Sequence, residues 1–165
     1  MTGNTDRIEK KILLRAPRER VWRAISDSQQ FGIWFGVAFD GPFVAGTRVR
    51  GTIVPTQVDA EVARMQERFA GEVFHVDVER VDPMDALSFR WHPYSEGSEA
   101  DYLHEPTTLV SFDLQEVTGG VMLTITESGF DQLPLERREQ AFTMNEGGWQ
   151  LQCRMIASYL AREAA

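Results

Sequence analysis

The sequence contains one cysteine, three histidines and 17 basic residues against 25 acidic ones in 165 residues. Because Cys153 stands alone, no disulfide can form within the chain, and this cysteine usage predicts a reducing, cytoplasmic location. The formal net charge of −8 repels phosphate, which argues against nucleic acid or an anionic membrane surface as a partner. No apolar run reaches the roughly 18 residues that would span a bilayer, so we expect no membrane insertion.

Sequence motifs for cofactors and nucleophiles are also lacking. The chain has no GxGxxG, GxxxxGK[ST] or GxSxG pattern and no HxxxH or Cys–His cluster, so we predict no cofactor, no metal and no catalytic triad. His75 and His92 fall at outward phase on neighbouring predicted strands. They are solvated surface groups or, alternatively, part of a weak metal site. His104 has no partner legible in the sequence, and Cys153 fits an inert packing thiol.

The remaining composition is that of an ordinary globular protein, with 42% hydrophobic and 25% charged residues. No repeat or linker divides the sequence. We therefore expect one domain over residues 7–163, preceded by a polar and disordered N-terminus at residues 1–6 that lacks the apolar core of a signal peptide.

Strand periodicity covers the middle of the chain. Apolar and polar residues alternate at 8–14, 72–81, 87–92, 110–115 and 121–126, with shorter strands at 37–39 and 47–54. Thr118-Gly119-Gly120 is a hairpin turn signal. Short turns between successive strands predict an antiparallel meander with one wet face.

Helical periodicity is found at both ends. Pro17 begins a short amphipathic helix, and Ser26-Asp27-Ser28 caps a second one that runs through residues 31–34. A third short helix is predicted at 59–68. From Pro134 onward the period is helical again, which predicts one long helix over about residues 135–162 whose apolar stripe lies along the sheet. The predicted fold class is α+β, with a curved antiparallel sheet of six to seven strands around this C-terminal helix.

Several local sequences, in this order, are similar to one family. They are Ala16-Pro17 with Val21-Trp22 and Ile25-Ser26-Asp27, Trp34-Phe35, Gly71-Glu72-Val73, Leu87-Ser88-Phe89-Arg90-Trp91, and Asn145-Glu146-Gly147-Gly148-Trp149. Over roughly residues 7–162 the chain resembles the START-like or SRPBCC superfamily with its helix-grip fold. Within it, the chain resembles the subfamily of activator of heat-shock-protein-90 ATPase homologue-like proteins.

The resemblance implies a cavity between the curved sheet and the long helix. Members of the superfamily bind lipids, hormones or polyketides there, and a few carry out chemistry. The segments 56–70 and 94–106 are longer than the usual connections. We expect residues 56–68 and 94–106 to flank the entrance of the cavity, because such irregular loops often cover ligand sites.

Glu127 is the acidic residue that the pattern singles out. It continues the inward parity of Val121, Leu123 and Ile125, and a carboxylate facing an apolar interior is costly unless it is paired or neutral. It fixes the polar head of a ligand, or acts as an acid or base with a raised pKa, or meets solvent at the rim because the strand ends or bulges there.

The glycine pair inside the last helix also needs an explanation. Gly147 and Gly148 cost about 2 kcal/mol relative to two alanines. They either make room for a ligand or let the helix pack closely on the sheet. Asn145 and Gln152, which flank Trp149, present amides to a ligand or occupy ordinary helix positions.

Aromatic residues fall mostly at inward phase, where they form core or line a pocket for a flat, apolar ligand. The predicted ligand-binding residues are Trp34, Phe39, Phe74, Phe89, Trp91, Phe112, Glu127, Asn145 and Trp149.

The function that the sequence favours is binding of a small apolar or aromatic molecule, without catalysis, because no acid–base dyad is legible. One alternative is a cyclase-, aromatase- or hydrolase-type enzyme that uses Glu127. Another is a protein-interaction module with a chaperone partner, which rests on the resemblance alone. A homodimer also stays open.

Overall fold

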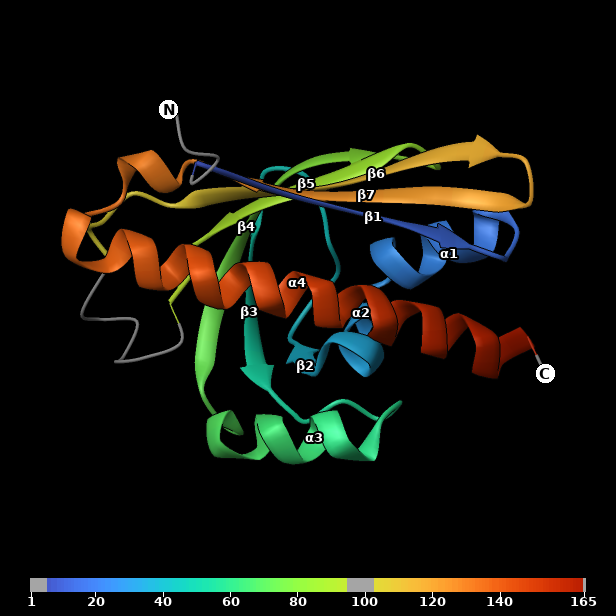
Figure 1. Cartoon of the computed structure of the whole chain (residues 1–165), viewed down its shortest axis with the longest axis horizontal. Helices are drawn as coiled ribbons and strands as arrows, with labels where there is room; N and C mark the ends of the chain where they lie inside the picture. The colour runs from blue at the N-terminus through green and yellow to red at the C-terminus, as the bar shows by residue number, and fades with distance from the viewer. Residues whose placement is uncertain (1–5, 95–102, 165) are drawn as a thin grey trace.

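The computed structural model describes residues 6–94 and 103–164. Two short helices follow the first strand, and a long helix follows the last strand (Figure 1). The strands are β1 (Arg7–Leu14), β2 (Val37–Phe39), β3 (Arg48–Ile53), β4 (Val73–Asp82), β5 (Ala86–Trp91), β6 (Thr108–Val117) and β7 (Gly120–Ser128). The helices are α1 (Arg18–Ser26), α2 (Ser28–Phe35), α3 (Ala60–Gln66) and α4 (Leu135–Ala164), with 3-10 turns η1 (Glu67–Phe69) and η3 (Phe130–Gln132).

In the described part of the chain the sheet has seven strands, in the order β1-β7-β6-β5-β4-β3-β2, all antiparallel. Burial alternates strictly along β7, with Val121, Leu123 and Ile125 inward. The same parity buries Glu127 completely. The predicted α+β helix-grip fold is therefore confirmed, and Glu127 does not lie at a solvated rim.

The two short helices close one end of the sheet. Asp27 ends α1 and caps α2, since its carboxylate accepts hydrogen bonds from the backbone N–H groups of Gln29 and Gln30 at 2.9 and 3.2 Å. Gly36 ends α2 in the left-handed conformation with φ of 100°. This turn directs the chain straight into the edge strand β2.

Helix α4 crosses the concave side of the sheet. Strands β1, β6 and β7 run along it in Figure 1, whereas β3 and β4 bend away toward α3, so that the sheet curves around the helix. α4 is one continuous helix of 30 residues, as the periodicity after Pro134 predicts. Its inward face carries Trp149, Met155 and Ile156, all buried.

The centre of the core is a cluster of aromatic rings. The ring of Phe31 lies 4.6–6.5 Å, between centroids, from six other aromatic rings. These are Trp34, Phe35, Phe39, Phe43, Phe89 and Phe112. This cluster fixes α2 against β2, β5 and β6.

Two predictions concern segments that the structure covers only in part. Residues 95–102, most of the irregular stretch 94–106, and residues 1–5 of the N-terminus lie outside the described residues. Asp6 is described, and its carboxylate accepts a hydrogen bond from Asp131 N at 3.1 Å. Within residues 6–94 and 103–164, no helix is both long enough and apolar enough to cross a membrane.

Candidate functional site

Glu127 is held by four side chains from three elements. Its Oε2 accepts hydrogen bonds from Trp91 Nε1 at 2.8 Å and Thr108 Oγ1 at 2.5 Å. Its Oε1 accepts from Trp149 Nε1 at 2.7 Å, and Asn145 Nδ2 donates to both oxygens at 3.0 and 3.2 Å. The carboxyl group therefore ties β5, β6 and α4 to β7.

The donors around Glu127 are all neutral. Burial is the largest influence on its pKa and raises it above the ordinary value of a glutamate. The hydrogen bonds from Thr108, Trp91, Trp149 and Asn145 act in the opposite direction, because they favour the charged form. The group is thus a buried carboxyl whose charged form is supported by the dipoles of four neutral hydrogen-bond donors.

The two tryptophans that bind Glu127 also stack on each other. The ring centroids of Trp91 and Trp149 lie 5.8 Å apart with an interplanar angle of 30°. Phe35 lies 6.2 Å from Trp91 and 5.8 Å from Trp149, and Phe74 lies 6.0 Å from Trp91. Because both indole N–H groups donate to one carboxyl, the orientation of both rings is fixed. The parts of the rings that face away from Glu127 form an aromatic wall.

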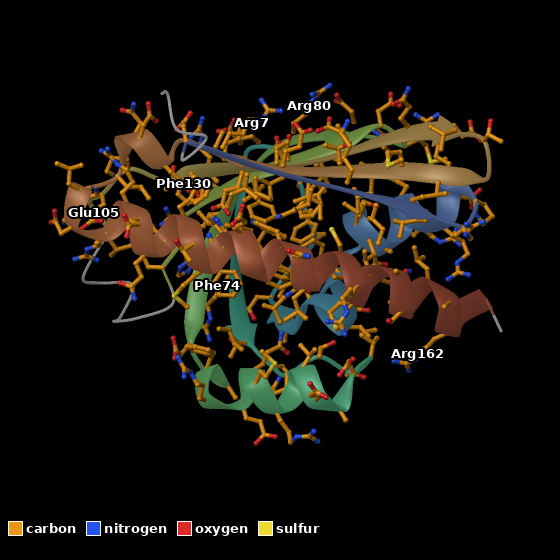
Figure 2. All side chains as sticks on the ribbon, in the orientation of Figure 1. Arg7, Phe74, Arg80, Glu105, Phe130 and Arg162 are labelled. Carbon is orange, nitrogen blue, oxygen red and sulfur yellow. The ribbon has the colours of Figure 1, made fainter. Side chains whose placement is uncertain are left out.

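That wall encloses a cavity of about 300 Å³ between α4 and the β3–β4–β5 part of the sheet. Figure 2 shows the labelled Phe74 on β4 just below α4, where the strand turns away from the helix. A smaller hollow of about 110 Å³ adjoins the same wall at Trp149. The larger cavity is lined by Phe35, Gly36, Ile53, Gln66, Phe69, Glu72, Val73, Phe74, Trp91, His92, Pro93, Tyr94, Met144, Asn145, Gly148, Leu151 and Gln152.

A polar cluster stands beside the cavity where Tyr94 meets the start of α4. Tyr94 Oη donates to Glu105 Oε1 at 2.8 Å, and Arg137 lies 3.4 Å from Glu105 Oε2 and 5.3 Å from the Tyr94 ring centroid. Burial and the Glu105 carboxylate raise the pKa of the tyrosine. His92 Nε2 lies 3.0 Å from the carbonyl oxygen of Glu105. These contacts join the end of β5 to the segment before β6 and to α4.

The α4 side of the cavity decides between the two explanations of the glycine pair. A Cβ added at Gly147 or Gly148 would meet no described heavy atom within 4 Å, so the helix does not need these glycines to approach the sheet. Gly147 is exposed, whereas Gly148 lies on the wall of both hollows. The space in front of Gly148 is the cavity itself.

The structure brings part of the predicted site together. Phe74, Trp91 and Asn145 line the larger cavity, and Trp149 lines the adjoining hollow. Glu127 lies behind this wall, fully buried, and holds it from the protein side.

Four predicted site residues lie elsewhere among the described residues. Trp34, Phe89 and Phe112 are at most 1% exposed and belong to the Phe31 cluster, where Trp34 Nε1 donates to Ala24 O at 2.9 Å. Phe39 lines a separate hollow of about 280 Å³ beside α2. Inward phase selects core and cavity residues alike, because both lie on the concave face of the sheet.

Several residues of the cavity wall are not among the ligand-binding residues that the sequence predicts. Phe35 faces the cavity, whereas its neighbour Trp34 on the same helix faces the core. Gln66 and Phe69 reach the cavity from α3 and η1. His92 lines the cavity because β5 ends at Trp91, so that strand parity no longer applies.

Metal-ligating side chains form no candidate site in the described part of the chain. Among residues 6–94 and 103–164, no group of three or more His, Cys, Asp or Glu side chains could hold a metal ion. Cys153 is buried, and burial raises the pKa of its thiol, as in an unreactive packing residue.

Comparison with solved structures shows the same fold. DynU16, from the dynemicin biosynthetic locus, matches with a TM-score of 0.65 and 24% identity, over 94% of this chain and 47% of that chain. The chain thus spans about half the length of DynU16. MLL2253 from Mesorhizobium loti matches with a TM-score of 0.68 and 20% identity, over 94% of this chain and 97% of that one.

Ms6760 from Mycobacterium smegmatis matches with a TM-score of 0.69 and 17% identity, over 97% of this chain and 94% of that one. At these identities the likeness concerns the fold. Comparison with curated proteins finds no match. The model of the family described as "Activator of Hsp90 ATPase homolog 1-like protein" matches residues 15–161, most of the sequence, and the chain therefore belongs to that family.

Proposed function

We propose that this protein binds a small, ring-bearing apolar molecule in the cavity between α4 and the sheet, and that it does so without catalysis. The volume of about 300 Å³ is at the lower end of ligand pockets, which span roughly 300–1,000 Å³. The aromatic walls of Phe35, Phe74 and Trp91 suit the faces and edges of a planar ligand. The proposal keeps the cytoplasmic location expected from the composition.

The observation that supports the proposal most directly is the open space in front of Gly148 on the cavity wall. A glycine in a helix interior costs about 1 kcal/mol relative to alanine, and nothing in the described packing requires one at this position. Among the described residues, its structural effect is to leave space on the cavity wall. A ring-lined cavity that a glycine widens at a cost in stability has the construction of a binding site.

Glu127 supports the binding alternative over the enzymatic one. A general acid or base must reach its substrate, whereas both oxygens of Glu127 are taken by wall side chains and the residue is fully buried. Its role in this proposal is to position Trp91, Asn145 and Trp149. Cyclase- or hydrolase-type chemistry would need another group.

The experiment is isothermal titration of the protein with 2-naphthol, a neutral two-ring probe. It compares the wild type with Gly148→Leu, which fills the cavity, and with Gly147→Leu, which places the same side chain one residue away on the exposed face. We expect the wild type and Gly147→Leu to bind equally and Gly148→Leu to bind at least about 10-fold more weakly, since a cavity filled by leucine excludes the ring.

Thermal unfolding of the three proteins controls for folding. Both leucine variants should unfold cooperatively at or above the wild-type temperature, because leucine is a better helix former than glycine. Binding that is absent from the wild type, or equal in wild type and Gly148→Leu, would overturn the proposal.

A further inference from the structure

Five side-chain donor groups on the walls of the two hollows already make hydrogen bonds within the protein. The N–H groups of Trp91, Trp149 and Asn145 all point at Glu127. Gln152 Nε2 and Gln66 Nε2 both donate to the carbonyl oxygen of Phe35, at 3.0 and 3.2 Å. The two indoles have no second N–H to offer a ligand, and each of the three amides already donates at least one N–H to the protein.

One hydrogen-bond acceptor on the same wall has no partner among the described residues. Gln152 is 8% exposed, lines both hollows, and its Oε1 is buried without a hydrogen bond from any described residue. A buried polar atom without a partner is uncommon and costs roughly 1–3 kcal/mol. The orientation of the amide is fixed, because a flip would set Oε1 against the Phe35 oxygen, and two acceptors repel.

Asn145 has the same arrangement two helical turns earlier on α4. Its Nδ2 donates to both oxygens of Glu127, so its Oδ1 is the amide atom that turns away from the carboxyl. Gly148 lies between the two amides, where the helix leaves open space. The α4 wall thus offers amide oxygens on either side of a gap.

The charges on the cavity wall also argue against an anionic ligand. Among the described residues that line the larger cavity there is no Lys or Arg, and Glu72 is the acidic one. The whole chain carries a net charge of −8. An anionic ligand would find no lysine or arginine among these residues, and burial of an unpaired charge is strongly unfavourable.

We propose that the cavity selects a neutral ring compound carrying a hydroxyl or N–H donor, and that Gln152 Oε1 accepts the hydrogen bond from that donor. The inference rests on the proposed function, since it names the class of ligand for the same cavity. A phenol or an aromatic amine fits it; a carboxylate or an aryl ether does not satisfy Gln152.

The test is a comparison of two probes that differ in the donor. 2-Naphthol and 2-methoxynaphthalene are titrated into the wild type, into Gln152→Met, and into Gln150→Met, which changes an exposed glutamine of α4. Methionine keeps the length of the side chain but cannot accept strongly. We expect the affinity ratio of naphthol to its ether to fall about 10-fold in Gln152→Met and to stay unchanged in Gln150→Met.

The outcomes separate this inference from the proposed function. If both probes bind the wild type and the ratio is the same in all three proteins, the selection by Gln152 is wrong while the cavity still binds rings. If neither probe binds the wild type, the proposed function fails as well. 2-Naphthoate that binds as tightly as 2-naphthol would overturn the preference for a neutral ligand.

A crystal structure of the wild type with 2-naphthol is a second test of the proposal and needs no variant. The naphthol oxygen should lie within about 3 Å of Gln152 Oε1. A naphthol bound in the cavity with its oxygen directed elsewhere would contradict the proposal even if Gln152→Met failed to fold.

Discussion

Two regions under the same sheet are built from the same kind of residue and differ in packing. Around Phe31 seven rings fill the space, and Gly32 on α2 is required, because an added Cβ would clash with the backbone oxygen of Val37. Around Trp91 and Trp149 the rings surround a hollow, and Gly148 faces open space. The first region is close-packed core, and the second is the wall of a cavity.

The comparison of the two regions indicates which residues are typical of a cavity wall. Aromatic side chains occur in both regions, so they do not distinguish them. The cavity is marked by the residues of α4 that interrupt the apolar stripe, namely Asn145, Gly148 and Gln152. Polar or missing side chains on the inward face of a helix indicate a space that the protein itself does not fill.

The largest expected effect comes from removing a ring in each region. Phe31→Ala should lower the free energy of unfolding by about 3–5 kcal/mol, because it opens a new void among close-packed rings. Phe74→Ala enlarges a hollow that already exists, and we expect less than about half that loss. Chemical denaturation measures both. Equal losses for the two variants would mean that the regions are packed alike.

Glu127→Gln is expected to be the next most costly change. Each carboxyl oxygen accepts one indole N–H, from Trp91 or from Trp149. Whichever way the new amide is turned, its NH2 group faces an indole donor, at a cost of about 1–3 kcal/mol. Glu146→Gln, at an exposed position on α4 next to Asn145, is the matched control and should be near neutral. Equal stabilities for the two variants would show that the four donors do not depend on the charge or the acceptors of Glu127.

The same buried carboxyl should make stability depend on pH. Because the pKa of Glu127 is raised in the folded state, the folded protein binds a proton that the unfolded chain has released. Stability therefore rises as pH falls from the folded pKa toward the ordinary value of 4.5, by at most about 1.4 kcal/mol per pH unit.

The Glu127→Gln variant isolates this contribution. The difference in unfolding free energy between wild type and variant should grow in that pH window and level off below it, since all other groups are shared. A difference that shrinks as pH falls would mean that the hydrogen bonds outweigh burial and lower the pKa.

The smallest expected effects are at the two helix glycines. Gly147→Ala and Gly148→Ala should each stabilise the protein by about 1 kcal/mol, since neither Cβ meets a described atom and alanine favours the helix. Thermal unfolding measures this gain. A loss of stability at Gly148 alone would show that the space in front of it is needed by the fold.

The sequence predicts the fold well, and the site only in part. Strand parity places Glu127 inward, and the change of period at Pro134 locates α4, because both depend on local patterns. Phe35 and Trp34 could not be separated in this way, since their roles depend on how α2 is rotated against β2 and α4. The unpartnered oxygen of Gln152 depends on three segments, α2, α3 and α4, that meet at the Phe35 carbonyl. No local pattern encodes such a meeting.

The most direct test of the central claim is to follow the indole N–H resonances during a titration with 2-naphthol. Trp91 and Trp149 stand on the walls of the two hollows and donate to Glu127, whereas Trp34 donates to Ala24 O inside the sealed core. We expect the resonances of Trp91 and Trp149 to shift on binding and the resonance of Trp34 to stay unchanged. Shifts of equal size at Trp34, or no shift at Trp91 and Trp149 when the probe binds, would contradict this expectation.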